Sequence, residues 1–247
     1  MAGVKKGSIS RRDFIKGTGL AVGGAAISSS VLAVACGKPA VVTPAAEPTP
    51  TPGVASFICP YDNQSFGTLA ALKTHLDSAH VGATVQVSDL TKLDVNGTEI
   101  SLYVKDNWTI AEVLRDRMGL TGLKISCNEG CCGMCTILVD GHSEMACMLL
   151  AKDAVGKKII TIEGLSVSGK DGGLDPVQKG WLKESGFMCG FCTPGFIMGA
   201  KALLLKNPNP TKAEVKQGLS GNICICGAYE NMANSVLAGV EIAKAGG

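Results

Sequence analysis

The 247-residue chain is long enough for one or two small domains with extensions, and its apolar fraction of 46% suffices for a packed core. This composition excludes a largely disordered chain. The net charge is +2, and the 23 Lys and Arg residues are interspersed with 21 acidic residues, which argues against nucleic acid as a partner. The eleven cysteines are more than a cytosolic protein of this size usually carries, so they indicate disulfides, metal or clusters.

The first 36 residues have the layout of an export signal. Arg11 and Arg12 precede an uncharged Gly, Ala, Val and Ser run that extends from Gly17 to Cys36. This pattern resembles a twin-arginine signal, which exports folded proteins, although the length of the run is also compatible with a membrane anchor. We expect the mature protein outside the cytoplasm, in the periplasm or on the outer face of the cell membrane.

Cys36 suggests how the exported protein is attached to the membrane. The sequence Ala-Val-Ala-Cys-Gly at 33–37 resembles a lipobox, in which Cys36 carries the lipid of a lipoprotein and anchors the chain to the membrane surface. The alternative is cleavage after Ala35 by signal peptidase at the Ala-x-Ala motif. Residues 37–54 form a linker whose Pro-rich tract favours extended polyproline II and reaches roughly 50 Å at ~3.1 Å per residue.

Residues 55–82 resemble a C2H2 zinc finger in which one ligand has changed. The candidate zinc ligands are Cys59, Asp62, His75 and His80. Asp62 stands where the finger has its second cysteine, and zinc accepts a carboxylate oxygen in tetrahedral sites. Phe66 and Leu72 occupy the places of the two core residues of the finger. Either the module binds zinc, or it has lost the metal and persists as a hairpin and helix docked on the main body. The predicted helix at residues 68–79 lacks clustered basic residues, so we do not expect the module to recognise DNA.

A domain of short strands follows. Strands are predicted at residues 90–95 and 99–104, joined by a turn at Asn96-Gly97. A helix is predicted at residues 109–118 with Gly119 as its end, because apolar residues recur on one face.

The next cysteines have the plant-type 2Fe-2S spacing, Cys-x4-Cys-x2-Cys with a fourth cysteine after a hairpin at Asp140-Gly141. These four are Cys127, Cys132, Cys135 and Cys147. Gly130 and Gly133 allow the loop to adopt positive φ and bring backbone N–H groups to the sulfurs. Cys131 is interpreted as a spare thiol, because its use as the second ligand in place of Cys132 would shorten the first spacing from Cys-x4-Cys to Cys-x3-Cys. Zinc and disulfides are the alternatives for this quartet.

The C-terminal part is predicted to contain four helices. Three lie at residues 175–185, 193–205 and 229–245, and the remaining one begins at the capping box formed by Thr211 and Glu214. Thr193 is predicted to cap the second of these helices, followed by Pro194. Four helices of this kind form a small bundle. The remaining cysteines lie at its helix junctions: Cys189, Cys192, Cys224 and Cys226.

The motifs at 189–195, 207–210, 219–222 and 224–226 resemble the iron-sulfur subunit of the xanthine oxidase family of molybdenum hydroxylases, and the likeness covers about residues 90–247, the first motif included. The resemblance implies an α+β fold, with a β-grasp (plant-type ferredoxin) domain at 88–166 and an all-α four-helix domain at 172–247. Each domain would hold one 2Fe-2S cluster, the first on the Cys127 quartet and the second on the Cys189 quartet.

The resemblance also implies a function. The chain would carry electrons from a large subunit, whose molybdopterin cofactor oxidises aldehydes, N-heterocycles, purines or carbon monoxide, and would have no substrate site of its own. Because flavin, nicotinamide and haem motifs are missing from the sequence, we expect the electron acceptor on another subunit or protein. A flavin subunit and a c-type cytochrome are the two candidates. The alternatives are a stand-alone ferredoxin-like carrier and an interaction module whose cysteines bind structural zinc.

Two positions depart from the family pattern. Met188 stands where the family has a glutamine that contacts the pterin, and Ile225 stands where it has an arginine between the last two cysteines. The Thr-Gly that normally follows is Gly227-Ala228 here. The loss of a positive charge would lower the potential of the second cluster, because a cation stabilises its reduced form. Neutral drift within a buried apolar interface is the alternative explanation.

Overall fold

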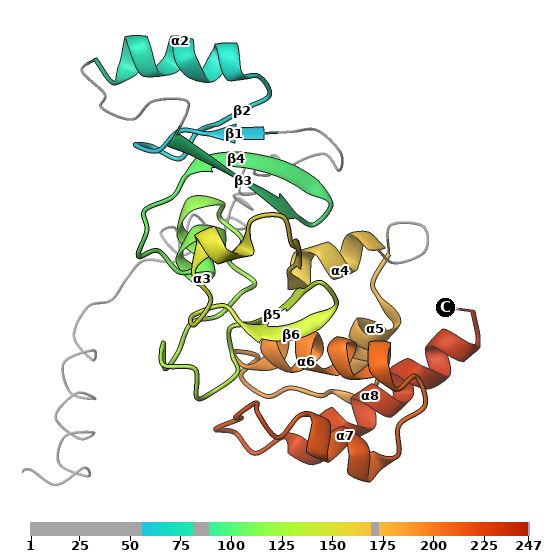
Figure 1. Ribbon diagram of the computed structural model, residues 1–247. Helices are drawn as coiled ribbons and strands as arrows, with labels where there is room; N and C mark the ends of the chain where they lie inside the picture. Colours follow the sequence, from blue (N-terminus) through green and yellow to red (C-terminus); the bar gives the residue numbers. More distant parts are fainter. Residues whose placement is uncertain (1–55, 82–88, 169–172, 247) are drawn as a thin grey trace, which may run out of the picture. The chain divides into compact units, whose positions relative to one another are not determined.

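The computed structural model describes residues 56–81, 89–168 and 173–246 (Figure 1). The predicted signal, Cys36 and the whole of the linker lie outside the described residues. Within the described ranges, every helix is too short or too polar to cross a membrane.

A single seven-stranded sheet runs through the first part of the described chain, in the order β2-β1-β4-β3-β7-β5-β6. Its strands are β1 (Ser56–Ile58), β2 (Ser65–Phe66), β3 (Leu90–Val95), β4 (Thr98–Tyr103), β5 (Thr136–Val139), β6 (His142–Met145) and β7 (Lys158–Ile160). The pairs β3–β4 and β5–β6 are antiparallel hairpins, whereas β1 lies parallel to β4. The hairpin of the finger-like module therefore continues the sheet of the ferredoxin-like domain.

Both predicted hairpin turns are confirmed by their backbone angles. Asn96 and Gly97 have φ of 55° and 78°, and Asp140 and Gly141 have φ of 50° and 81°. Positive φ at both central residues matches the right-handed twist of the flanking strands, and Asn, Asp and Gly tolerate it best.

The helical elements confirm an α+β arrangement. They are α2 (Leu69–Ala79), α3 (Ile110–Glu112), the π-helical turn η2 (Val113–Arg117), the 3-10 turn η3 (Ala151–Ala154), α4 (Ile162–Ser168), α5 (Pro176–Glu184), α6 (Thr193–Lys206), α7 (Lys212–Gly218) and α8 (Tyr229–Lys244). The four predicted C-terminal helices correspond to α5 through α8, and α4 is an additional short helix. α6 lies against β5 and β6 (Figure 1).

The helix predicted at 109–118 begins as expected but changes type. Thr109 and Glu112 form a reciprocal capping box, in which the Thr109 side chain accepts from the Glu112 N–H. After Glu112 the helix widens into η2, where the Met118 N–H donates to the Val113 carbonyl 3.1 Å away. Gly119 then ends it at a φ of 70°. Val113 and Leu114 are both buried, together with Ile110, as the apolar pattern of the segment predicts; the change to a π-helical turn was not predicted.

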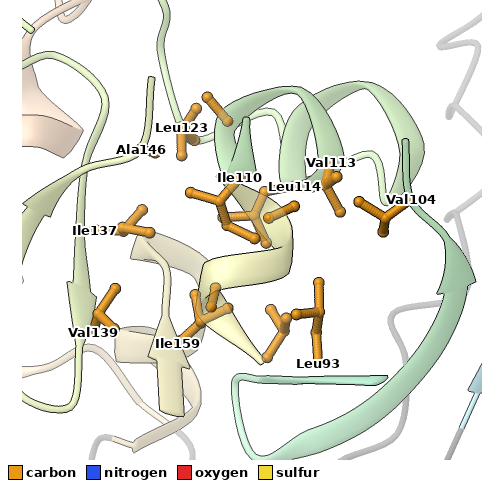
Figure 2. Close-up of a cluster of buried hydrophobic side chains, with 14 of the residues drawn as sticks. Leu93, Val104, Ile110, Val113, Leu114, Leu123, Ile137, Val139, Ala146 and Ile159 are labelled. Atoms are coloured by element: carbon orange, nitrogen blue, oxygen red, sulfur yellow. The ribbon is translucent and has the colours of Figure 1, made fainter. Parts of the chain in front are cut away.

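The core of the ferredoxin-like domain lies between the sheet and the α3–η2 segment. Leu93, Ile110, Leu114, Ile137 and Ile159 are each at most 1% exposed. Figure 2 shows these side chains converging from the strands and the helix. This core fixes the positions at which the cysteine loop begins and ends.

The prediction that Thr193 caps α6 is wrong. Cys192 is the residue before the helix, and it makes no side-chain cap. Thr193 is already helical, and its hydroxyl is buried without a hydrogen-bond partner. The physical reason is the turn before the helix, in which the Thr193 backbone N–H donates to the Gly190 carbonyl, 3.2 Å away, instead of extending as a capped start requires.

Candidate functional site

The first predicted quartet is brought together by a loop and a hairpin. Cys127, Cys132 and Cys135 lie on the loop before β5, and Cys147 lies just after β6. The thiols interact most directly in two pairs: Cys127 with Cys132, and Cys135 with Cys147. Cys132, Cys135 and Cys147 are buried, whereas Cys127 is half-buried.

Backbone amides surround the sulfur of Cys127. Asn128, Gly130 and Gly133 have φ of 55°, 71° and 68°, so the loop bends repeatedly through the left-handed region. The N–H groups of Glu129 and Cys131 therefore donate to the Cys127 sulfur and lower its pKa to about 7. At Cys135, burial raises the pKa of the thiol to about 12. Amide donors of this kind would stabilise the negative charge of a bound cluster.

The second predicted quartet also forms two pairs. Cys189 and Cys192 precede α6, and Cys224 and Cys226 lie between α7 and α8. Cys189 interacts with Cys226, and Cys192 interacts with Cys224. The Phe191 N–H donates to the Cys189 sulfur and lowers its pKa, whereas burial raises that of Cys192 to about 12.

Two hydrogen bonds join the two cysteine loops. One is donated by a side chain to a backbone carbonyl, and the other links two backbone groups. The side-chain amide of Asn222 donates to the Gly133 carbonyl, at 2.7 Å, in a buried position. The Ile223 N–H donates to the Cys132 carbonyl at 2.9 Å. Cys132 of the first quartet is thus one hydrogen bond away from the residue next to Cys224 of the second quartet. The role of Asn222 was not predicted, because its partner lies 89 residues away in the sequence and leaves no local signal.

The pairing suits a 2Fe-2S cluster, in which each of two irons takes two cysteine sulfurs. A one-ion site would gather all its ligand atoms around a single point. Among the described residues, the group with that property contains Cys59, Asp62, His75 and His80, whose ligand atoms all lie within 4.8 Å of one another. Cys131 is exposed, and its thiol donates to the Glu129 carbonyl at 3.4 Å. The ten described cysteines are all free thiols.

Large apolar side chains are exposed around the second quartet. Met188 is 68% exposed and Ile225 is 91% exposed, so both departures from the family pattern lie on the surface. The other exposed apolar residues near these cysteines in sequence are Phe187, Phe191, Ile223 and Tyr229. Exposed large apolar side chains, when they gather on a surface, mark protein interfaces. We call these six residues the apolar collar.

Two family models match the chain. Residues 93–158 match the 2Fe-2S iron-sulfur cluster binding domain, and residues 161–237 match the [2Fe-2S] binding domain. The finger-like module at 56–80 precedes both ranges.

Several curated relatives are iron-sulfur subunits. The nicotine 6-hydroxylase small subunit of Paenarthrobacter nicotinovorans is 43% identical over 156 residues, which cover 62% of this chain and 92% of the relative. The xanthine dehydrogenase iron-sulfur-binding subunit of Escherichia coli O157:H7 is 41% identical, over 58% of this chain and 89% of the relative. The crystal structure of quinoline 2-oxidoreductase from Pseudomonas putida 86 superposes with a TM-score of 0.59 at 38% identity, over 64% of this chain and 96% of that one. The chain therefore belongs to the family of small iron-sulfur subunits of the xanthine dehydrogenase and aldehyde oxidoreductase enzymes.

Proposed function

We propose that this chain is the electron-transfer subunit of a molybdenum hydroxylase and holds two 2Fe-2S clusters. The observation that carries the proposal is that the fold brings the eight predicted cysteines together as two quartets of interacting thiols. The first cluster would be bound by Cys127, Cys132, Cys135 and Cys147, and the second by Cys189, Cys192, Cys224 and Cys226. When bound, each cluster supplies a site that accepts and releases one electron.

The protein contributes ligands, donors and burial. Each pair of interacting thiols would serve one iron, so Cys127 and Cys132 would share one and Cys135 and Cys147 the other. The Cys224 backbone N–H donates to the Tyr229 hydroxyl, 2.8 Å away, which fixes the loop beside the second quartet. The contacts of Asn222 and Ile223 with the first loop hold the two sites at a constant separation.

The exposure of the apolar collar supports the proposal that a large partner subunit binds there. Cys189 is exposed and Cys226 is half-buried, so the edge of the second quartet reaches the surface beside Met188 and Ile225. We propose that a molybdopterin-containing subunit covers this surface and oxidises an aldehyde, an N-heterocycle, a purine or carbon monoxide. The external acceptor would be a flavin subunit or a c-type cytochrome. Export by the twin-arginine route and a lipid anchor at Cys36 are proposed on the sequence alone.

Purification of the tagged chain from its native host tests the assignment. We expect a larger chain to coelute, with molybdenum in the complex and about four irons per copy of this chain. A monomer with about four irons and no molybdenum would instead support the stand-alone ferredoxin-like carrier. A chain purified without oxygen that contains no iron and only zinc would contradict both assignments.

The exposed position of Ile225 gives a second prediction. Ile225→Arg should raise the potential of the second cluster by tens of millivolts, because a nearby cation stabilises the reduced form. Ile225→Glu should lower it, and Ile225→Gln should leave it nearly unchanged. The measurement is a redox titration of the isolated chain followed by electron paramagnetic resonance. If Arg and Glu shift the potential in the same direction, charge is not the cause.

A further inference from the structure

The finger-like module brings four potential metal ligands to one point. The Nε2 of His75 lies 3.0 Å from Asp62 Oδ2, and the Nε2 of His80 lies 3.3 Å from the same oxygen. The Cys59 sulfur completes the group, within 4.8 Å of the other three atoms. Ligand atoms about 2.0–2.1 Å from a tetrahedral zinc are about 3.3 Å from each other. The nitrogen-to-oxygen distances thus agree with a tetrahedral site.

Hydrogen bonds from neighbouring backbone N–H groups orient Cys59 and Asp62 toward this point. The Cys59 sulfur accepts hydrogen bonds from the N–H groups of Tyr61 and Asp62, as metal-bound sulfur often does. Asp62 uses its other oxygen, Oδ1, to accept from the Gln64 N–H at 3.0 Å. Its Oδ2 is left to face the two imidazoles.

Both imidazole rings are held by aromatic neighbours. Phe66 lies against His75 and Tyr61 stacks on His80, each with ring centroids 4.8 Å apart. The Nε2 of His75 is buried and makes no hydrogen bond, although Asp62 Oδ2 lies 3.0 Å away. An ordinary pair of Asp–His hydrogen bonds would satisfy this nitrogen, whereas a metal would accept its lone pair directly.

The module is too small to be stable on its core alone. Its buried apolar cluster consists of Cys59, Leu72 and Leu76, with partly buried neighbours. Domains below about 40 residues usually need a metal, disulfides or association. Cys59 is a free thiol, so it does not form a disulfide that would stabilise the module. Association contributes, because strand β1 of the module pairs with β4 of the ferredoxin-like domain.

We propose that Cys59, Asp62, His75 and His80 bind one structural zinc ion, which fixes the finger-like module against the edge of the ferredoxin-like domain. One thiolate, one carboxylate and two imidazoles suit zinc, whereas calcium and magnesium prefer oxygen ligands alone. Four protein ligands leave no open position, so the ion is structural. The module lies outside both family-matched ranges, and the proposal is therefore independent of the proposed function.

The test is metal analysis of the full chain, purified with its clusters and equilibrated with zinc. We expect about one zinc per chain in addition to the iron. X-ray absorption at the zinc edge should show one sulfur at about 2.3 Å and three nitrogen or oxygen atoms at about 2.0–2.1 Å. His75→Ala and Cys59→Ser should each reduce zinc at least tenfold and leave the iron content unchanged.

Two matched controls and one rescue variant complete the design. His142→Ala removes the one other histidine of the chain, which is exposed on β6, and Cys131→Ser removes an exposed thiol; both should retain zinc. Asp62→Cys should retain zinc and show two sulfurs in its first shell. The proposal is overturned if the wild-type chain binds less than a tenth of a zinc, or if zinc persists in both His75→Ala and Cys59→Ser. Iron content reports on the proposed function separately.

Discussion

Replacing Cys135 with alanine is expected to remove the first cluster and leave the second. Cys135 is buried and paired with Cys147, so the substitution leaves one iron with a single protein sulfur in a site that water does not reach easily. Iron should fall from about four to about two per chain, and one of the two paramagnetic signals of the reduced protein should disappear. Iron analysis and electron paramagnetic resonance measure both effects.

Cys131→Ala is the matched control, since it deletes a thiol from the same loop. Cys131 is exposed, and its thiol contacts the Glu129 carbonyl. This variant should keep both clusters. An unchanged iron content in Cys135→Ala, or loss of the first signal in Cys131→Ala, would mean that the quartet has been assigned incorrectly.

Gly133→Ala is expected to be severely destabilising although it adds only a methyl group. Gly133 has a φ of 68°, which costs a residue with a Cβ about 1–2 kcal/mol. The new Cβ would also lie 2.6 Å from the Asn222 side-chain nitrogen and 2.6 Å from the Gly221 carbonyl. The buried hydrogen bond from Asn222 would break, at a cost of about 1–3 kcal/mol. We expect the free energy of unfolding to fall by about 3 kcal/mol or more, as measured by urea unfolding followed by circular dichroism.

Gly156→Ala separates the two contributions to this effect. Gly156 has a φ of 78°, and a Cβ there would meet no atom within 4 Å. Its alanine variant should lose only the backbone term, about 1–2 kcal/mol. Equal losses in the two variants would show that the contact between the loops contributes nothing to stability.

The features that could be predicted from the sequence are those encoded locally. The hairpin turns follow from Asn96-Gly97 and Asp140-Gly141, because few other residues tolerate positive φ. The capping boxes of α3 and α7 follow from Thr and Glu three residues apart. The spacing of Cys127, Cys132 and Cys135 predicted the first quartet, because a loop that wraps a cluster must place its sulfurs at fixed intervals, whereas the second quartet was predicted from its place at the helix junctions and from the family resemblance.

The features that could not be predicted depend on distant contacts. The bond from Asn222 to Gly133 joins two domains. The widening of the helix after Glu112 into a π-helical turn also has no signal in the apolar pattern, which fits a regular helix. Thr193 shows the limit of a local rule, since the preceding turn overrides its capping preference. The parallel pairing of β1 with β4 also has no local signal, because the strands are separated by about forty residues.

That pairing also affects the behaviour of the chain among other folded proteins. Without β1, the six-residue strand β4 would form one border of the sheet, and its unpaired N–H and C=O groups would offer a template to other strands. With the module in place, the sheet ends instead in β2, of two residues, and β6, of four. Borders this short give another chain little to pair with. The module thus protects the domain from aggregation through its sheet, whether or not the clusters are bound.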